Sequence, residues 1–547
     1  MAQMKTPGVY IQEKNAFGNS IVEVATAVPV FIGYTEIAMS NGKSILNQPW
    51  PISSLSEFET YFGGAPVPSF EFQEVSDKSD GSSADTPFDI LGEHTYSVKT
   101  ESTTKYKIVQ SSNQYFLYYC MQLFFQNGGG NCYIMSVGDY SSTISQTDFT
   151  NAFGPLEKEE EPTIVVMPDA VLLDQEDCYA VEQQALLHCG TMQNRVAIVD
   201  IWNGYQDLNQ PSATTNQIDN FRNSIGTNFL EYSMAYYPWL NTSNVSEGAL
   251  LYSSLSSDSL TTLQNLIMNE FTPVPDSTSA LAKAIANLTK TDEELVPGTP
   301  AKPEVKKGDK VVTPATDAKP ATPAQINAAK KRLSQTLLSV STVYKNVLSD
   351  MATILNTLPP SAAMAGVYTM VDNTQGVWKA PANVSLNSVI APTVTISNQE
   401  QQNLNMPLDG KAVNAIRVFK GEGTMVWGAR TLDGNSQDWR YINVRRTMIM
   451  LEQSIKDACK VFVFDANDAH TWLSVETMIT AFLTTIWSQG GLAGSSAAEA
   501  FSVAVGLGKT MNADDILNGI MKVVVLVAIT HPAEFIQITF EQEMQKG

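Results

Sequence analysis

Short apolar runs alternate with amphipathic segments over the first two hundred residues. Residues 21–34 become fully apolar near Phe31, and 162–169 and 194–201 are similar runs, as expected of strands buried on both faces. Residues 116–138 predict an amphipathic helix, a glycine stop and a further buried strand, and a helix lies around 178–189. Strand, helix and strand in succession favour a parallel α/β layer.

The last third of the chain has the same mixed character. Met448, Leu451, Ile455 and Cys459 share one helical face, and residues 475–486 follow the helical spacing. We predict strands over 460–465 and 521–529, the latter buried, and a short helix that Asn512 caps and that runs to Met521. The expected fold class is therefore α/β with mixed α+β parts, in several domains.

Each end of the chain carries a strand that stands apart from the body. Near the C-terminus, Ile536, Ile538 and Phe540 alternate with polar residues, and no turn or partner strand follows them. Near the N-terminus, Thr6–Glu13 is a similar strand, and the polar, glycine-containing stretch Lys14–Ser20 separates it from the next one. The pattern raises the question of what these terminal strands pair with.

Two segments interrupt the periodic pattern. Residues 76–85 form a polar loop, and residues 296–325, rich in Pro, Ala, Lys and Thr, predict an exposed, mobile insertion that builds no core. One long helix is expected from about Ile326 to Leu358, where Pro359 and Pro360 stop it.

Composition narrows the classes of function. The net charge of −22 over 547 residues argues against binding of nucleic acid or of anionic membrane surfaces. Five cysteines, an odd number, favour folding in a reducing compartment without a disulfide framework. We expect no secretory signal, because the N-terminus reaches Pro7 and Gly8 without the apolar run of a signal peptide. We also expect no membrane span, because the longest apolar run, Val523–Ile529, is too short to cross a bilayer.

Candidate chemistry is sparse. The stretch Ala504–Thr510 resembles a phosphate-binding loop, but Val503 stands where the first glycine belongs, so a plain strand-to-helix turn is favoured. Cys178, His188 and Cys189 match no metal-ligand spacing, and a buried helical cysteine with a satisfied histidine is the better interpretation. No catalytic, cofactor or metal site is expected, and the chain is predicted not to be an enzyme.

An ordered series of segments resembles the contractile tail sheath proteins of myophages, pyocins and related injection systems. The series covers both ends of the chain and the junction between its halves. It consists of TPGVYIQE (6–13), SLSEFETYFGG (54–64), FFQNGGGNCYIMSVG (124–138), PPSAAMAGVYTMVDNTQGVWKAPAN (359–383), NAIRVFKGEGTMVWGARTL (414–432), WRYINVRR (439–446) and HPAEFIQITFEQ (531–542).

The resemblance implies a domain organisation and a role for the terminal strands. Sheath proteins donate N-terminal and C-terminal arms to the C-terminal domains of neighbouring subunits, so each arm adds a strand to an open sheet edge. The implied units are an N-terminal arm and linker (1–20), outer domains (21–358), a junction block (359–383), a C-terminal inner domain facing the tube (384–530) and a C-terminal arm (531–547).

Two sets of residues are expected to carry this assembly. The strands between subunits would use Val9, Tyr10, Ile11, Ile536, Ile538 and Phe540. The C-terminal domain or its interfaces would be supported by Gly428, Arg430, Thr431, Arg445 and Arg446. For the arginines, salt bridges within the domain are an equally open alternative, and Trp378 and Pro381 are expected in a structural turn.

The implied function is that of a sheath subunit that polymerises helically around an inner tube and contracts to drive it into a target cell envelope. The implied partners are further copies of the chain, the tube protein, and baseplate and terminator or cap proteins, in the bacterial cytoplasm during assembly and then in a virion or an extracellular tail-like particle. Two alternatives stay open: a nucleotide-driven motor that uses Lys509 and Thr510, and a surface adhesin, which the absence of repeats disfavours.

Overall fold

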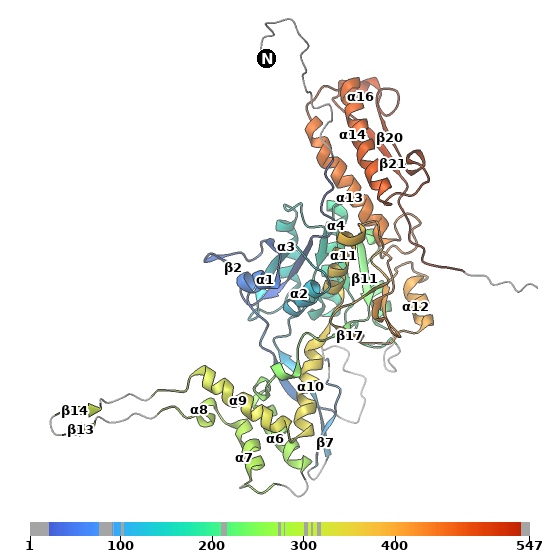
Figure 1. The fold of residues 1–547 in the computed structure, drawn as a ribbon. Helices are drawn as coiled ribbons and strands as arrows, with labels where there is room; N and C mark the ends of the chain where they lie inside the picture. Colours follow the sequence, from blue (N-terminus) through green and yellow to red (C-terminus); the bar gives the residue numbers. More distant parts are fainter. Residues whose placement is uncertain are drawn as a thin grey trace, which may run out of the picture.

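The protein is described from a computed structural model (Figure 1). It describes residues 21–75, 90, 92–99, 103–208, 216–271, 275–277, 279–299, 305–307, 310–313 and 319–537.

A nine-stranded sheet forms the centre of the molecule (Figure 1). Its order is β16 (Val384–Ser385), β19 (Gly423–Val426), β18 (Asn414–Phe419), β11 (Ser233–Tyr237), β10 (Val196–Asp200), β9 (Ile164–Val166), β1 (Pro29–Thr35), β8 (Cys132–Asp139) and β4 (Trp50–Ile52). The inner strands from β18 to β8 pair in parallel, and the strands at both edges pair antiparallel. This pairing confirms the predicted parallel layer. Strands β1, β9, β10 and β11 are also buried at every residue, as expected of strands covered on both faces.

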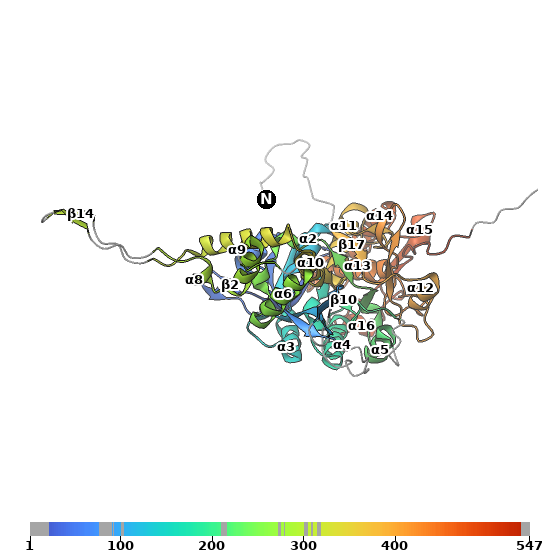
Figure 2. The same cartoon turned by 90° about the horizontal axis from the view of Figure 1, so that it is seen from below.

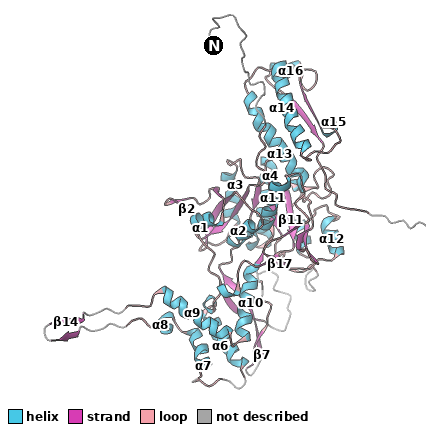
Figure 3. Cartoon of the chain, in the orientation of Figure 1, coloured by secondary structure: helices cyan, strands magenta, loops and turns pink. Residues whose placement is uncertain are grey.

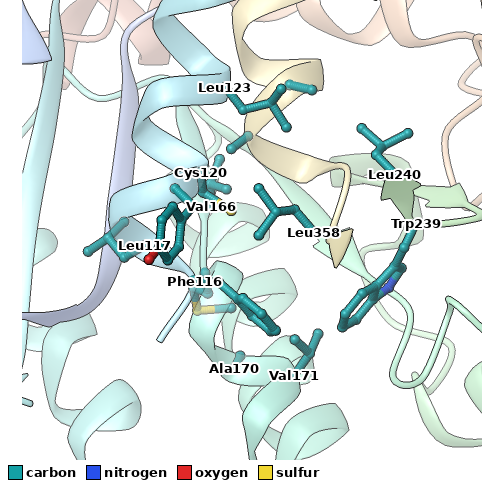
Figure 4. Packing of buried hydrophobic residues seen from close by; sticks show 14 of the residues in the cluster. Phe116, Leu117, Cys120, Leu123, Val166, Ala170, Val171, Trp239, Leu240 and Leu358 are labelled. Atoms are coloured by element: carbon teal, nitrogen blue, oxygen red, sulfur yellow. The ribbon is translucent and has the colours of Figure 1, made fainter. Parts of the chain in front are cut away.

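Helices pack against this sheet in two pairs. Helices α2 (Leu117–Gln126) and α11 (Ser361–Gln375) contact each other and the central strands, and α3 (Gln146–Leu156) contacts α4 (Gln175–Met192). Figure 4 shows the apolar side chains at the start of α2, where the ring of Phe116 meets that of Trp239 edge-on at 5.7 Å between centroids. This cluster belongs to what we call the first core.

Two buried carboxylates at the carboxyl ends of parallel strands cap these helices. Asp169 accepts hydrogen bonds from the backbone N–H groups of Phe116 (2.6 Å) and Leu117 (3.1 Å) at the start of α2. Asp200 accepts one from the N–H of Ser361 (3.0 Å) at the start of α11, and another from the Ser361 hydroxyl. In α/β sheets, ligands bind at the carboxyl ends of the strands. At these two positions, the N-termini of α2 and α11 occupy that edge of the sheet.

Burial gives one of these carboxylates a testable pH dependence. Burial raises the pKa of Asp200 to about 7, although its hydrogen bonds with Ser361 lower it. The stability that this raised pKa contributes is present below the ordinary pKa and is lost as the pH rises through the folded-state value. The difference in unfolding free energy, wild type minus Asp200→Asn, should therefore fall by on the order of 3 kcal/mol between pH 5 and pH 8. Urea denaturation at several pH values measures it, and a constant difference would contradict the raised pKa.

A peripheral unit lies beside the sheet and carries the insertion (Figures 1 and 3). Its sheet is formed by β5 (Ser69–Glu74), β7 (Thr103–Ser112) and β6 (Tyr96–Lys99). Its helices are α6 (Ser257–Glu270), α7 (Ala280–Ala286), α8 (Asp292–Leu295), α9 (Pro323–Leu338) and α10 (Thr342–Asn356). Within the insertion expected at 296–325, β13 (Val305–Lys307) and β14 (Lys310–Thr313) form a small hairpin that projects away from the body (Figures 1 and 2), and α9 already begins at Pro323.

The single helix predicted over 326–358 is wrong, because the chain forms α9 and α10 with a break between them. Ser341 caps α10, and its hydroxyl accepts a hydrogen bond from the N–H of Tyr344. The carboxylate of Glu270 also accepts from the Ser341 hydroxyl (2.6 Å) and from the N–H of Thr342 (2.7 Å). The capping serine and the nearby carboxylate stabilise the start of a new helix at this point, so the chain does not continue α9.

A second core follows along the chain. It is built by α13 (Ile442–Cys459), α14 (Ala469–Ser488), α15 (Ala497–Ala500), β20 (Phe501–Val505) and β21 (Val523–Val527). The short helix α16 (Ala513–Leu517) lies between these two strands along the chain and buries no residue. The helical faces predicted on α13 and α14 are confirmed, and Asn512 caps α16, which ends at Leu517 and so before Met521.

Two predicted features of this part are wrong. Residues 460–465 form a 3₁₀ turn, Lys460–Phe462, followed by exposed residues, and none of the described strands pairs with them. The strand at 521–529 exists as β21, but Val524 and Leu526 are 45% and 64% exposed, so it is not buried. The domain division expected at 384 stays a prediction; β18, which follows this position, pairs with β11 in the nine-stranded sheet.

Candidate assembly interface

A two-stranded ribbon, β20 with β21, lies on the surface of the second core. The strands pair antiparallel from Phe501 opposite Val527 to Val505 opposite Val523. The odd-numbered valines of β21 pack toward the core, and the residues between them face outward. Among the described residues, no third strand joins either edge of the ribbon. A ribbon of two strands is marginal by itself, and its open edges are templates for further strands.

The stretch that resembled a phosphate loop is a structural turn of this ribbon. The N–H of Gly506 donates to the hydroxyl oxygen of Thr510 (3.2 Å), and this hydroxyl donates to the carbonyl of Lys522 (2.6 Å). These bonds join the end of β20 to the start of β21. The hydroxyl that a phosphate loop would offer to a metal is therefore engaged inside the protein.

The C-terminal root, which we define as residues 528–534, runs from the ribbon to the first core and ends on an ion pair. The carboxylate of Glu534 accepts hydrogen bonds from Nε (3.1 Å) and Nη2 (2.6 Å) of Arg430, from Nδ2 of Asn405 (2.6 Å) and from the hydroxyl of Tyr441 (3.2 Å). Burial acts to raise the pKa of Glu534, but the bonds from Arg430 and Asn405 outweigh it and hold this pKa below its ordinary value. Four donors on one carboxylate make this a fixed point of the chain.

The N-terminal root, residues 21–28, is held by a second arginine. Arg446 donates from Nη1 (3.0 Å) and Nη2 (2.6 Å) to the carboxylate of Asp372, and from Nη2 to the carbonyl of Thr26 (3.0 Å). The Thr26 hydroxyl donates to the same carboxylate at 2.6 Å. The N–H of Val24 donates to the hydroxyl of Ser454 on α13 (3.1 Å), and Ile21 is buried in the second core. The root is thus tied to α11 and α13.

A cavity of about 730 Å³ borders this root. Val24–Thr26 form one wall, Ile449 and Met450 of α13 lie opposite, and acidic side chains such as Glu161 and Asp457 supply much of the polar lining. On this side, hydrogen bonds rather than close packing therefore hold the root.

The other predicted support residues build the frame around these roots. The guanidinium of Arg445 lies between the rings of Tyr232 (4.5 Å) and Trp439 (4.3 Å). The Thr431 hydroxyl donates to the Trp439 carbonyl at 2.8 Å. At Gly428 a Cβ would lie 2.7 Å from Oδ1 of Asn414, so the backbone approach requires glycine there.

The predicted strand residues are placed only in part. Val9, Tyr10, Ile11, Ile538 and Phe540 lie outside the described residues. Ile536 is described, is 80% exposed and pairs with no strand among the described residues. Sequence reasoning missed Glu534, Asp372 and Thr26, which are the partners of Arg430 and Arg446. Two signals could have pointed to the acidic partners: Glu534 stands just before the predicted terminal strand, and Asp372 lies inside the junction block.

The histidine and cysteines around 178–189 lie buried at helix α4. Burial raises the pKa of Cys189 to about 12, and burial together with Arg195 lowers the pKa of His188 to about 4. The described residues contain no group of three or more His, Cys, Asp or Glu side chains that could hold a metal ion. In the part of the chain that the structure covers, no helix combines the length and apolar character needed to cross a membrane.

Comparison with known proteins places this interface in context. Residues 435–543 match the family model of the phage tail sheath C-terminal domain. The tail sheath protein of Vibrio phage KVP40 is 28% identical over 138 residues, and that of Enterobacteria phage T4 is 24% identical over 160 residues. These matches cover 25% and 29% of this chain but 20% and 24% of the phage proteins, so the chain matches only a fraction of their length.

Solved structures match over nearly the whole chain. The sheath of the PVC extracellular contractile injection system in its contracted state gives a TM-score of 0.56 at 23% identity and covers 99% of both chains. The contracted helical sheath of the anti-feeding prophage gives 0.55 at 23% identity, covering 99% of this chain and 100% of its own. This likeness shows a shared fold. The chain is thus similar to phage tail sheath proteins over residues 435–543, and it shares its fold with the sheath subunits of contractile injection systems.

Proposed function

We propose that this chain is the structural subunit of a contractile sheath that polymerises helically around an inner tail tube. The observation that carries the proposal is the β20–β21 ribbon, which no third strand joins among the described residues, together with exposed apolar side chains near both ends of the described chain. Val22, Phe535 and Ile536 are 80%, 72% and 80% exposed there. Apolar side chains in such positions are expected where a second copy covers them.

Strand exchange accounts for the assembly. An arm of one copy adds to the ribbon of the next through backbone hydrogen bonds, while outward residues such as Val524 and Leu526 gain an apolar neighbour. A contact of this kind joins different surfaces of two copies, so it does not close on itself and propagates as a helix. Residues 384–530 are proposed as the part that faces the tube, and the peripheral unit as the outer part.

Contraction would release free energy stored at assembly. The extended sheath waits behind a high barrier, which is kinetic stability, until a baseplate signal releases it. Subunits then shift largely as rigid bodies while the exchanged strands keep them linked, and the tube is driven through a target cell envelope. The proposed partners are the tube, the baseplate and a terminator or cap protein, first in the bacterial cytoplasm and then in a virion or extracellular tail-like particle. No catalytic step is required of this chain.

Electron microscopy tests the proposal directly. The purified chain should form hollow, striated cylinders in negative stain without added nucleotide. Lys509→Ala should form them equally well, because Lys509 lies in a turn that its neighbours hold by hydrogen bonds. Compact monomers at every concentration would argue against a sheath subunit. Nucleotide-dependent assembly that Lys509→Ala abolishes would support the motor alternative, which no observation in the structure favours.

A further inference from the structure

The C-terminal arm leaves the body directly after Glu534. The side chains of Arg430 and Glu534 are 3% and 21% exposed, whereas the next two residues, Phe535 and Ile536, are 72% and 80% exposed. The change from a held to an exposed backbone position therefore takes place between Glu534 and Phe535. A bidentate arginine–carboxylate pair in a partly buried place holds both position and direction.

Arg430 connects this fixed point to the first core. Its backbone N–H donates to Oδ1 of Asn414 on β18 at 2.7 Å, and its Nη1 donates to the carbonyl of Asn405 at 3.2 Å. Strand β18 pairs with β11 in the nine-stranded sheet. The ribbon β20–β21, in contrast, packs on the second core. One core thus carries the origin of the arm, and the other carries the edges proposed to receive an arm.

We propose that Arg430 and Glu534 form an anchor that sets the spacing between neighbouring copies in the assembled sheath. This inference rests on the proposed function, and its partner is a second copy of the chain. An arm that starts at Glu534 has an origin that is fixed relative to the first core. A short tether of defined origin gives a high effective concentration at the acceptor edge and a narrow range of docking positions. Arg430 is a positioning residue in this scheme: it acts through the arm and touches no partner copy.

The anchor predicts a specific defect in assembly. The double variant Arg430→Met with Glu534→Met removes the pair without leaving one buried charge unpaired. It should still form tubes, but at a threshold concentration about tenfold higher than that of the wild type. The axial repeat, measured by helical reconstruction, should become broader. Sedimentation over a concentration series gives the threshold.

Matched variants separate positioning from folding. Arg417→Met is the control, because Arg417 donates to Asn398 Oδ1 (2.9 Å) on α12 (Asn398–Asn405) and holds no arm root. It should leave both threshold and repeat unchanged. If the double variant fails to fold, Glu534→Gln decides: it keeps the size of the side chain and should raise the threshold by about threefold. A merely structural role would lower the melting temperature and leave the axial repeat as it is.

The same experiments distinguish failure of the anchor from failure of the proposed function. If the anchor variants fold and show the wild-type threshold and axial repeat, the anchor is overturned. The proposed function still holds in that case, provided that the wild-type chain forms tubes. A wild-type chain that forms no tubes overturns the proposed function and the anchor with it.

Discussion

Chains that lack residues Met1–Asn15 should remain soluble monomers under conditions in which the intact chain forms tubes. Such a deletion removes the strand predicted at Thr6–Glu13 and spares the N-terminal root, whose contacts begin at Ile21. The fold should therefore persist while one of the two exchanged strands is lost. If this strand contributes about 3 kcal/mol per copy, the threshold for assembly rises about a hundredfold.

Sedimentation and negative stain measure this result, and a replacement variant provides the control. A chain in which Gly and Ser replace Met1–Asn15 at equal length should fail in the same way, because length without apolar side chains gives a strand little to bury. Its thermal unfolding as a monomer should match that of the intact chain. Ordinary long tubes from either variant would show that the N-terminal strand is not exchanged.

The central sheet was predictable because parallel strands covered on both faces are apolar throughout. β9 and β10 are runs of this kind, and a helix between them allows little but a parallel crossover. Residues 460–465 contain a similar apolar run, Val461–Phe464, yet no described strand pairs with it, so it forms a turn with Phe464 fully exposed. Periodicity in the sequence shows which face of a segment is apolar, but the tertiary fold decides whether a partner strand lies beside it.

The contacts of the candidate site also depend on tertiary structure, and over longer separations in the sequence. Arg430 and Arg446 were singled out through their place in family-like segments, and salt bridging within the domain was left open. Both do form ion pairs within the chain, and both pairs hold a terminal root. Their root contacts are 104 residues away, at Glu534, and 420 residues away, at Thr26. No local pattern joins residues so far apart, so the fold alone identifies the partners.

Removing one partner of the ion pair between Arg446 and Asp372, at the N-terminal root, should lower the stability of the fold more than the loss of any other single contact described above. Arg446 and Asp372 have side chains only 3% and 4% exposed, and the guanidinium also lies 4.6 Å from the ring centre of Tyr368. Arg446→Met leaves the Asp372 carboxylate buried with Thr26 as its remaining donor. We expect the free energy of unfolding, from urea denaturation of the monomer, to fall by about 3 to 5 kcal/mol.

Two further variants show whether the lost stability comes from the unpaired charge. Arg446→Met combined with Asp372→Leu replaces the pair by apolar groups and should recover most of the loss, because burying a lone carboxylate is the larger cost. Glu452→Gln alters the partner of the neighbouring Arg445, but Glu452 is 44% exposed, so it should change stability by less than about 1 kcal/mol. Hydrogen exchange should show faster opening of Val24–Val28 in Arg446→Met than in Glu452→Gln, because only the former releases the N-terminal root. Equal exchange in the two variants would mean that apolar burial at Ile21, rather than the ion pair, holds the root in place.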